Sequence, residues 1–376
     1  MNQKEYSGWG SIEKLEEIIR KEEPKKVFLV TGKSSYNSSG AQEQINRILY
    51  GIETKRFSDF SVNPKLKEIK IGIKSFKQNE YDLVIAVGGG SPIDVAKAIN
   101  ALSSNSGSPE DYVTGKIKVE SKGKPFIAIP TTSGSGSEAT KFAVIYIDKT
   151  KYSLSNDLII PDYTIIDPQL TMSLPTNQTA CTGMDALGQA IESYWSINST
   201  LESKKYSKEA ISLLFDNLED AVNNPTRENK EKVARASNLA GKAINLTQTT
   251  ACHAISYPIT SHYGIPHGHA VGLTLGEMLV YISKVSEKDS LDERGPEYVS
   301  KSINEILQTM NANSSEEGRN KLTSLMESIG LKTKLSSLGV KDIELIIKNG
   351  FNPQRVKNNP RKLAEEELRE ILKRIQ

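Results

Sequence analysis

The chain has 376 residues, a formal net charge of +2, and a composition of 37% hydrophobic and 25% charged residues. This length exceeds what one hydrophobic core usually supports, and this composition excludes a largely disordered protein, so we expect two folded domains. The small net charge and the lack of a long apolar run argue against nucleic acid and membrane as partners.

The first half of the chain alternates short apolar strand patterns with helical patterns. Strands are predicted at residues 26–31, 81–87 and 126–129, and helices at 41–49 and 93–102. Continuous apolar strands that alternate with helices indicate a parallel sheet covered on both faces. Shorter strands are predicted at 143–147, 151–155 and 164–166, as a hairpin and its return. We therefore expect an α/β, Rossmann-like domain over residues 1–170.

The second half changes character near residues 168–176. Its apolar residues recur at a period near 3.6, which predicts helices at 177–195, 208–222, 231–247, 304–310, 315–329, 341–348 and 363–375. We therefore expect an all-helical domain over residues 171–376. The two cysteines, Cys181 and Cys252, are too few for a disulfide framework, and no targeting peptide is evident, so a cytoplasmic protein is expected.

Two glycine-rich segments each follow a predicted strand, at the edge of a parallel sheet where ligands bind. Gly88, Gly89 and Gly90 precede Ser91 and a helical pattern, and residues 131–138 are dense in hydroxyls and glycines. Glycines let a phosphate approach the backbone, and a helix N-terminus offers it N–H groups. A tight turn or a flexible linker is the simpler explanation of each segment alone. Side by side, they would form a groove suited to a dinucleotide.

Candidate metal ligands lie in the predicted helical domain. Asp185 and Gln189 lie one helical turn apart among apolar residues, where a carboxylate is costly to bury unless it is paired or bound to a cation. A carboxylate that caps its own helix is an equal alternative for this motif alone. All four histidines, His253, His262, His267 and His269, fall within 17 positions. Imidazole and carboxylate together suit Zn²⁺ or Fe²⁺, although a solvated histidine-rich loop is the competing explanation.

These motifs resemble the iron-containing alcohol dehydrogenase family along essentially the whole chain. Residues 88–97 resemble its pyrophosphate loop, 130–138 its second cofactor loop, 183–187 and 264–268 its metal segments, and 359–361 a later family motif. The resemblance implies an enzyme with a Rossmann-like domain and an all-α domain, as in the dehydroquinate synthase-like fold. It implies an NAD(P)H-dependent interconversion of a small aldehyde and its alcohol. We also expect a homodimer or a larger homo-oligomer.

The resemblance assigns the metal ligands, with one departure. Asp185, His253 and His267 match family ligands, whereas Gln189 stands where the family usually has a histidine. An amide oxygen is a weaker and harder ligand than imidazole. Related glycerol dehydrogenases hold Zn²⁺ with Asp and two His, and three protein ligands suffice for a catalytic zinc site. We expect one divalent metal, Fe²⁺ or Zn²⁺, at these four residues.

The cofactor segment after the first strand departs from the family pattern as well. Many NAD-specific members have an Asp where this chain has Gly32, followed by Lys33 and Ser34. Without that carboxylate a 2′-phosphate is not repelled, which favours NADPH over NADH, with use of both as an alternative. The remaining cofactor contacts implied by the resemblance are Asn63, Gly88, Gly89, Gly90, Ser91, Asp94, Thr131, Thr132, Ser135, Thr140, Phe142 and Lys151.

Residues 192–200, 253–260 and 267–271 resemble a subgroup that includes phosphonoacetaldehyde reductases, which form 2-hydroxyethylphosphonate. Lys141 is a candidate partner for an anionic substrate, and Tyr257 or His269 for a proton relay. Butyraldehyde, lactaldehyde and succinic semialdehyde are alternative substrates. A dehydroquinate synthase-like lyase shares the implied fold, but its carboxylate-binding basic cluster is not evident here. A non-catalytic nucleotide-binding protein with a decayed metal site is the alternative of another class.

Overall fold

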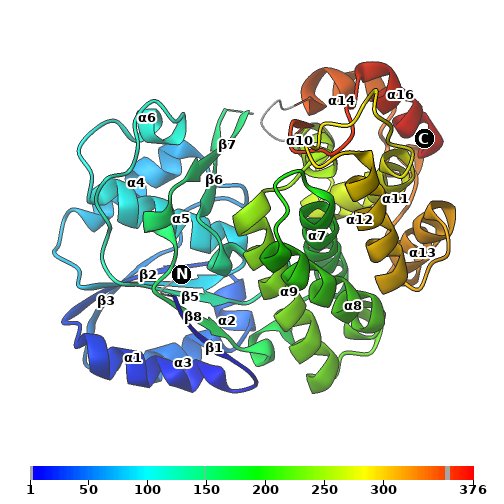
Figure 1. Ribbon diagram of the computed structural model, residues 1–376. Coiled ribbons are helices and arrows are strands. Elements are labelled where there is room, and N and C mark those ends of the chain that lie inside the picture. The colour runs from blue at the N-terminus through cyan, green and yellow to red at the C-terminus, as the bar shows by residue number, and fades with distance from the viewer. Residues whose placement is uncertain (1–2, 149, 352–355) are drawn as a thin grey trace. The chain divides into compact units, whose positions relative to one another are not determined.

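The computed structural model describes residues 3–148, 150–351 and 356–376. The chain divides into two compact units, Met1–Leu174 and Pro175–Gln376, and each unit has hydrophobic core clusters of its own. The sheets lie in the first unit and most of the helices in the second (Figure 1). Among the described residues, no helix combines the length and apolar character needed to cross a bilayer.

The first unit is built on a parallel six-stranded sheet, which confirms the predicted fold class. Its strand order is β1-β8-β5-β4-β2-β3, and every neighbouring pair runs parallel. The strands are β1 (Lys4–Ser7), β2 (Lys26–Thr31), β3 (Glu53–Phe57), β4 (Leu83–Gly88), β5 (Phe126–Pro130) and β8 (Tyr163–Ile166). The predicted hairpin is the separate antiparallel pair β6 (Phe142–Ile147) and β7 (Thr150–Ser155). The expected strands at 26–31, 81–87, 126–129 and 164–166 all belong to the main sheet.

Strands β1 and β3 were not predicted because both lie at sheet edges. Four of the five β3 residues are exposed, so its sequence carries no continuous apolar run. The buried strands alternate their side chains between two layers, with Leu29 and Ile85 facing one core and Phe28 and Val84 the other. Helices α1 (Lys14–Glu22) and α3 (Ala41–Ile48) cover the first face, and α4 (Leu66–Phe76) and α5 (Gly90–Ser103) cover the second (Figure 1). The short helices α2 (Ser35–Ser38) and α6 (Pro109–Val113) complete the helices of this unit among the described residues.

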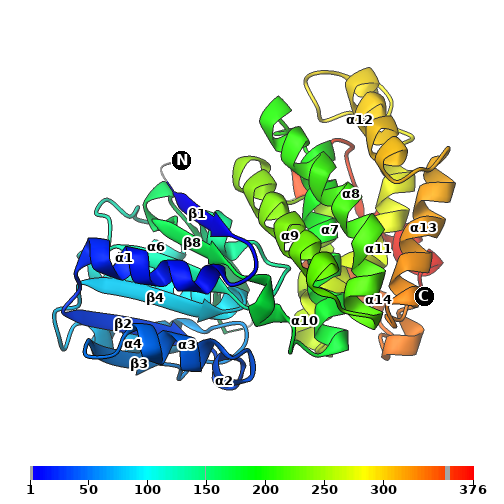
Figure 2. The same ribbon diagram turned by 90° about the horizontal axis from the view of Figure 1, so that it is seen from below.

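The second unit is helical, as predicted. Helix α7 (Thr176–Trp195) packs against α8 (Leu201–Asn223), α9 (Arg227–Thr247) and α11 (His267–Ile282) (Figure 2). The other helices described there are α10 (Ala251–Tyr263), α12 (Pro296–Thr309), α13 (Ser315–Ser328), α14 (Ile343–Gly350) and α16 (Glu365–Arg374). Helix α11 escaped prediction because it is buried on almost all sides, and α10 because it contains Pro258, a residue that usually ends or kinks a helix. A helix that is apolar all round shows no amphipathic period.

Candidate metal centre and cofactor loops

Three helices of the second unit bring together Asp185 of α7, His253 of α10 and His267 of α11. One ligand atom from each residue lies within 4.8 Å of the others. His253 Nε2 lies 3.3 Å from Asp185 Oδ1, and His267 Nε2 lies 3.9 Å from the same oxygen. Residues separated by 82 positions in the sequence thus converge on one carboxylate oxygen.

A glycine allows α11 to approach α7 closely enough for this convergence. Helix α11 begins at His267, with Pro266 as its N-cap, and Gly268 follows. A Cβ atom at Gly268 would lie 1.9 Å from the Cys181 carbonyl oxygen and 2.8 Å from the Asp185 backbone nitrogen. Only a residue without a side chain permits this contact between the two helices.

The chemistry of the three residues fits a divalent cation. His253 Nε2 is buried and makes no hydrogen bond to any described residue, yet it faces a carboxylate oxygen. Two electron-pair donors that face each other in a buried site are stabilised by a cation between them. Burial lowers the pKa of His253, but the Glu192 and Asp185 carboxylates outweigh it and raise this pKa to about 9. The same carboxylates favour any positive charge here, whether a proton or a metal ion.

Of the other predicted residues of this unit, Gln189 and Tyr257 lie near the three candidate ligands, whereas His269 is bound to a different loop. Gln189 is buried on α7 one turn after Asp185, as its spacing predicted. The Tyr257 ring stacks on His267, with 5.8 Å between ring centroids and 23° between planes. His269 Nε2 instead donates a hydrogen bond of 2.7 Å to the Lys332 carbonyl oxygen, and burial lowers its pKa. His269 is thereby tied to the loop after α13, which disfavours the proton relay considered for it.

In the first unit, three loops adjoin at the carboxyl edge of the sheet. The Gly32 backbone N–H donates to the Val87 carbonyl oxygen at 3.3 Å, and that of Thr131 donates to the Gly88 carbonyl oxygen at 3.0 Å. The two glycine-rich segments therefore lie side by side, because β4 and β5 are neighbours in the sheet.

The glycines of the first segment provide clearance between these loops. A Cβ atom would lie 3.2 Å from Thr132 Oγ1 if placed at Gly89, and 2.9 Å from Ser135 Oγ if placed at Gly90. Gly89 is also the N-cap of α5, so the first N–H groups of that helix have no capping side chain there. Free N–H groups and the helix dipole suit the pyrophosphate of a dinucleotide.

Asp94, which the resemblance assigns to the cofactor, is bound to the second glycine-rich loop. Its buried carboxylate accepts hydrogen bonds from Ser137 Oγ and, at 3.0 Å, from the Val144 backbone N–H. Both oxygens are thus bound within the protein, so Asp94 anchors the second loop, and its contact with the cofactor stays a prediction.

Lys97, which sequence reasoning missed, anchors the same loop. Its buried ammonium donates to the carbonyl oxygens of Ser137 and Thr140, both at 2.6 Å, and of Phe142 at 2.8 Å. The predicted cofactor residues Thr140 and Phe142 thus use their backbone to bind this lysine. Burial lowers the pKa of Lys97 to about 8. Its signal in the sequence was a lysine flanked by apolar residues in a helical pattern.

The loop after β2 is bound by a cation of β3 that was also missed. Arg56 of β3 donates from Nε to Thr31 Oγ1 at 2.7 Å, and from Nη2 to the carbonyl oxygens of Gly32 and Lys33 at 3.1 and 3.2 Å. Its guanidinium therefore lies beside Gly32. Lys33 forms an exposed ion pair with Asp59 at 3.4 Å, and Ser34 is the N-cap of α2.

Three remaining predicted residues lie around these loops. Asn63 has a left-handed backbone (φ 61°), and its N–H donates to Ser91 Oγ at 3.4 Å. Lys151 lies on β7, opposite Tyr146 of β6. Lys141 Nζ forms an ion pair with Asp157 Oδ1 at 3.1 Å, so an anionic substrate would compete with that carboxylate.

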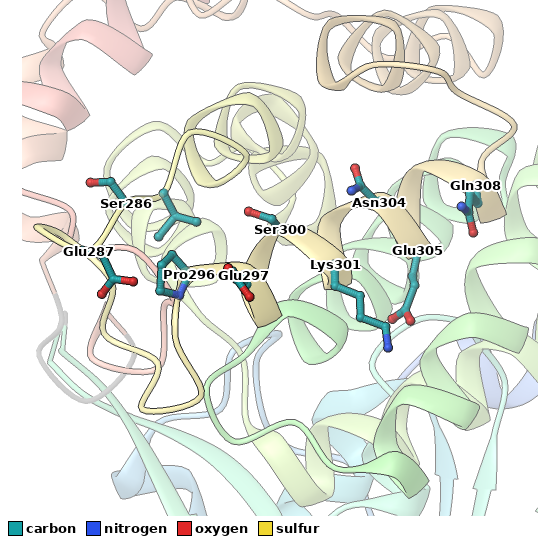
Figure 3. Close-up of a pocket in the computed structure, with 10 residues that line it drawn as sticks. Ser286, Glu287, Pro296, Glu297, Ser300, Lys301, Asn304, Glu305 and Gln308 are labelled. Carbon is teal, nitrogen blue, oxygen red and sulfur yellow. The ribbon is translucent and has the colours of Figure 1, made fainter.

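A surface hollow along α12 contains none of the predicted site residues. Figure 3 shows Glu297, Lys301 and Glu305 along this helix, with Glu287 on the preceding loop. Its lining has three glutamates, one lysine and no histidine. This chemistry provides neither the nitrogen ligands of the candidate metal centre nor the glycine-rich backbone of the cofactor loops.

Comparisons with known proteins cover both units. The family model described as iron-containing alcohol dehydrogenase matches residues 2–168, and the C-terminal model of the Fe-containing alcohol dehydrogenase family matches residues 179–376. A phosphonoacetaldehyde reductase from Streptomyces viridochromogenes is 33% identical over 304 residues, which span 77% of this chain and 75% of that protein. An NADPH-dependent butanol dehydrogenase from Clostridium saccharobutylicum is 30% identical over 97% of this chain and 94% of its own.

Among solved structures, the chain is similar to sulfoacetaldehyde reductase from Bifidobacterium kashiwanohense in complex with NAD⁺. The TM-score is 0.90 and the sequence identity 31%, over 100% of this chain and 97% of the other.

Proposed function

Because the chain belongs to the iron-containing alcohol dehydrogenase family, we propose that it reduces phosphonoacetaldehyde to 2-hydroxyethylphosphonate. The relatives it matches are NAD(P)-dependent alcohol dehydrogenases and aldehyde reductases. One aldehyde, one NAD(P)H and one proton give one alcohol and one NAD(P)⁺. The observation that carries this proposal is the similarity to a phosphonoacetaldehyde reductase and to a sulfoacetaldehyde reductase. Both names denote a two-carbon aldehyde with an anionic oxygen-rich group at its far end.

In this proposal Asp185, His253 and His267 would hold one divalent metal, Fe²⁺ or Zn²⁺, and Gln189 would be a further ligand. A cation bound there would polarise the carbonyl group as a Lewis acid, while the reduced nicotinamide would supply the hydride. The chain's own part is to hold two imidazole nitrogens and a carboxylate within 4.8 Å of one another. Tyr257, which stacks on His267, orients that ligand and is the candidate that delivers a proton.

NADPH is the preferred cofactor in this proposal. The loops at Gly89 and Thr132 would hold its pyrophosphate beside the N-terminus of α5. With Gly32 at this position, the chain lacks the carboxylate that would repel a 2′-phosphate, and the Arg56 guanidinium lies against the same loop. Lys33, whose partner Asp59 is exposed, adds a second cation.

Two alternatives have support of their own. The similarity to a butanol dehydrogenase favours an uncharged aldehyde of the butyraldehyde type as the substrate. A non-catalytic nucleotide-binding role would follow if Gln189 marked a decayed site. The convergence of three ligand atoms argues against this second alternative, because a decayed site has no reason to retain it.

A substrate panel tests the proposal. NADPH oxidation is followed with phosphonoacetaldehyde, sulfoacetaldehyde, succinic semialdehyde, lactaldehyde and butyraldehyde, and we expect the phosphonate to have the highest kcat/KM. If butyraldehyde is used equally well, the substrate assignment fails while the dehydrogenase assignment stands. Turnover should disappear with a chelator and return with Zn²⁺ or Fe²⁺. Turnover that persists without metal contradicts the metal's role.

A further inference from the structure

Glu192, on α7 two turns after Asp185, is a fully buried carboxylate beside the candidate metal centre. Its Oε1 accepts hydrogen bonds from Thr250 Oγ1 at 2.7 Å and from the Cys252 backbone N–H at 2.6 Å. Its Oε2 accepts from the Thr250 backbone N–H at 3.1 Å and is bound by His253 Nδ1. Four donors at the first turn of α10 therefore stabilise the charged form of this buried group.

This arrangement determines which nitrogen of His253 carries a proton. An ionised carboxylate can only accept hydrogen bonds, so the Nδ1 atom of His253 must donate to Glu192. In the neutral ring Nε2 then keeps its lone pair, and that atom faces Asp185 Oδ1 at 3.3 Å. In the neutral ring, which is the form that binds a metal, the nitrogen directed at the site is therefore the one without a proton.

Ser256 imposes the same choice on His267 through a different hydrogen bond. Ser256 is fully buried, and its hydroxyl donates to the His253 carbonyl oxygen at 2.7 Å. Because its only proton is used there, the Oγ atom must accept at its second contact, 3.1 Å from His267 Nδ1. His267 therefore also carries its proton on Nδ1 and directs the lone pair of Nε2 toward Asp185.

We infer that Glu192 and Ser256 are positioning residues that preset both histidines in the metal-binding tautomer. Neither is among the predicted metal ligands, and each acts through a histidine. The carboxylate of Glu192 additionally makes His253 a stronger electron-pair donor, and with Asp185 it balances the two positive charges of a divalent cation. This inference rests on the proposed metal site.

The principal test is the affinity of the metal-depleted protein for Zn²⁺, measured by competition with a chromophoric chelator. In Glu192→Gln an amide N–H replaces one accepting oxygen, which opposes donation from His253 Nδ1. We expect Zn²⁺ affinity to fall about 10- to 100-fold, with NADPH affinity unchanged. Ser256→Ala should weaken Zn²⁺ binding about tenfold, and Glu192→Asp, which keeps the charge, should bind more tightly than Glu192→Gln.

Glu277→Gln is the matched control, because Glu277 is another buried carboxylate of this unit and is paired with Arg319 and Arg374. Its Zn²⁺ affinity should equal that of the wild type. With only four histidines in the chain, ¹⁵N-histidine spectra of the Zn²⁺-loaded protein report the tautomers directly. We expect both ligand rings to carry the proton on Nδ1.

The outcomes separate the inference from the proposed function. If Glu192→Gln and Ser256→Ala both bind Zn²⁺ as tightly as the wild type, or if the spectra show Nδ1 coordination, the inference is overturned. If the wild-type protein itself binds no Zn²⁺ or Fe²⁺, the proposed metal site fails first.

Discussion

Replacing Gly268 by Ala tests whether close contact between α11 and α7 positions His267. The new methyl carbon would lie 1.9 Å from the Cys181 carbonyl oxygen, which is backbone and cannot rotate away. Restoring an ordinary contact of 3.4 Å requires the two helices to separate by about 1.5 Å, at a cost of about 1–3 kcal/mol in unfolding free energy. Metal–ligand distances tolerate deviations of about 0.2 Å, so His267 would be lost as a ligand.

We therefore expect Gly268→Ala to lower Zn²⁺ affinity by at least about 100-fold and to lower turnover with it, while NADPH binding is retained. Zn²⁺ affinity, NADPH affinity and urea unfolding are the measurements. Gly350→Ala is the control, since a Cβ atom there meets its nearest neighbour, Ile255 Cα, at an ordinary 3.4 Å. Zn²⁺ affinity of Gly268→Ala equal to that of the wild type would refute the argument that backbone contact places His267.

Two further predictions concern the cofactor loop and a buried lysine. Gly32→Asp should lower kcat/KM for NADPH about tenfold and raise that for NADH, because a carboxylate beside the loop repels a 2′-phosphate; equal losses with both cofactors would indicate a misplaced loop. Lys230 is 3% exposed, and burial lowers its pKa to about 8. Since its folded pKa lies below its unfolded value, the cost of burying this charge is greatest below pH 8, and stability should rise as the pH increases toward 10.5. Lys230→Met should remove that rise, worth up to about 3 kcal/mol in the difference between wild-type and variant unfolding free energies; parallel pH curves for the two proteins would contradict it.

Membership of the family explains why the motifs could be found without the structure. Glycines after an apolar strand, and histidines gathered in one segment, are local features of the sequence. Their chemistry follows from residue type, because glycines let a phosphate approach the backbone N–H groups and imidazole nitrogens bind divalent cations. The parallel sheet was predictable for the same reason, since a buried strand is a continuous apolar run.

The elements that escaped prediction lack such local contrast. Strand β3 is largely exposed at the sheet edge. Helix α11 is buried almost all round and therefore shows no amphipathic period, and α10 contains a proline that interrupts the helical pattern. The candidate ligands His253 and His267 lie on these two helices. Their chemistry was therefore predictable, but the helices that carry them were not.

By itself the sequence determined the fold class, the glycine-rich loops and the candidate ligands Asp185, His253 and His267. Only the tertiary structure decided what each polar side chain faces. Asp94 faces Ser137, and Glu192 reaches His253 across 61 positions of sequence. The physical reason is that residue type and spacing specify the chemistry and the face of one element. The partner of a buried charge is chosen when separate elements pack, because the group must then find its hydrogen bonds wherever the neighbouring chain supplies them.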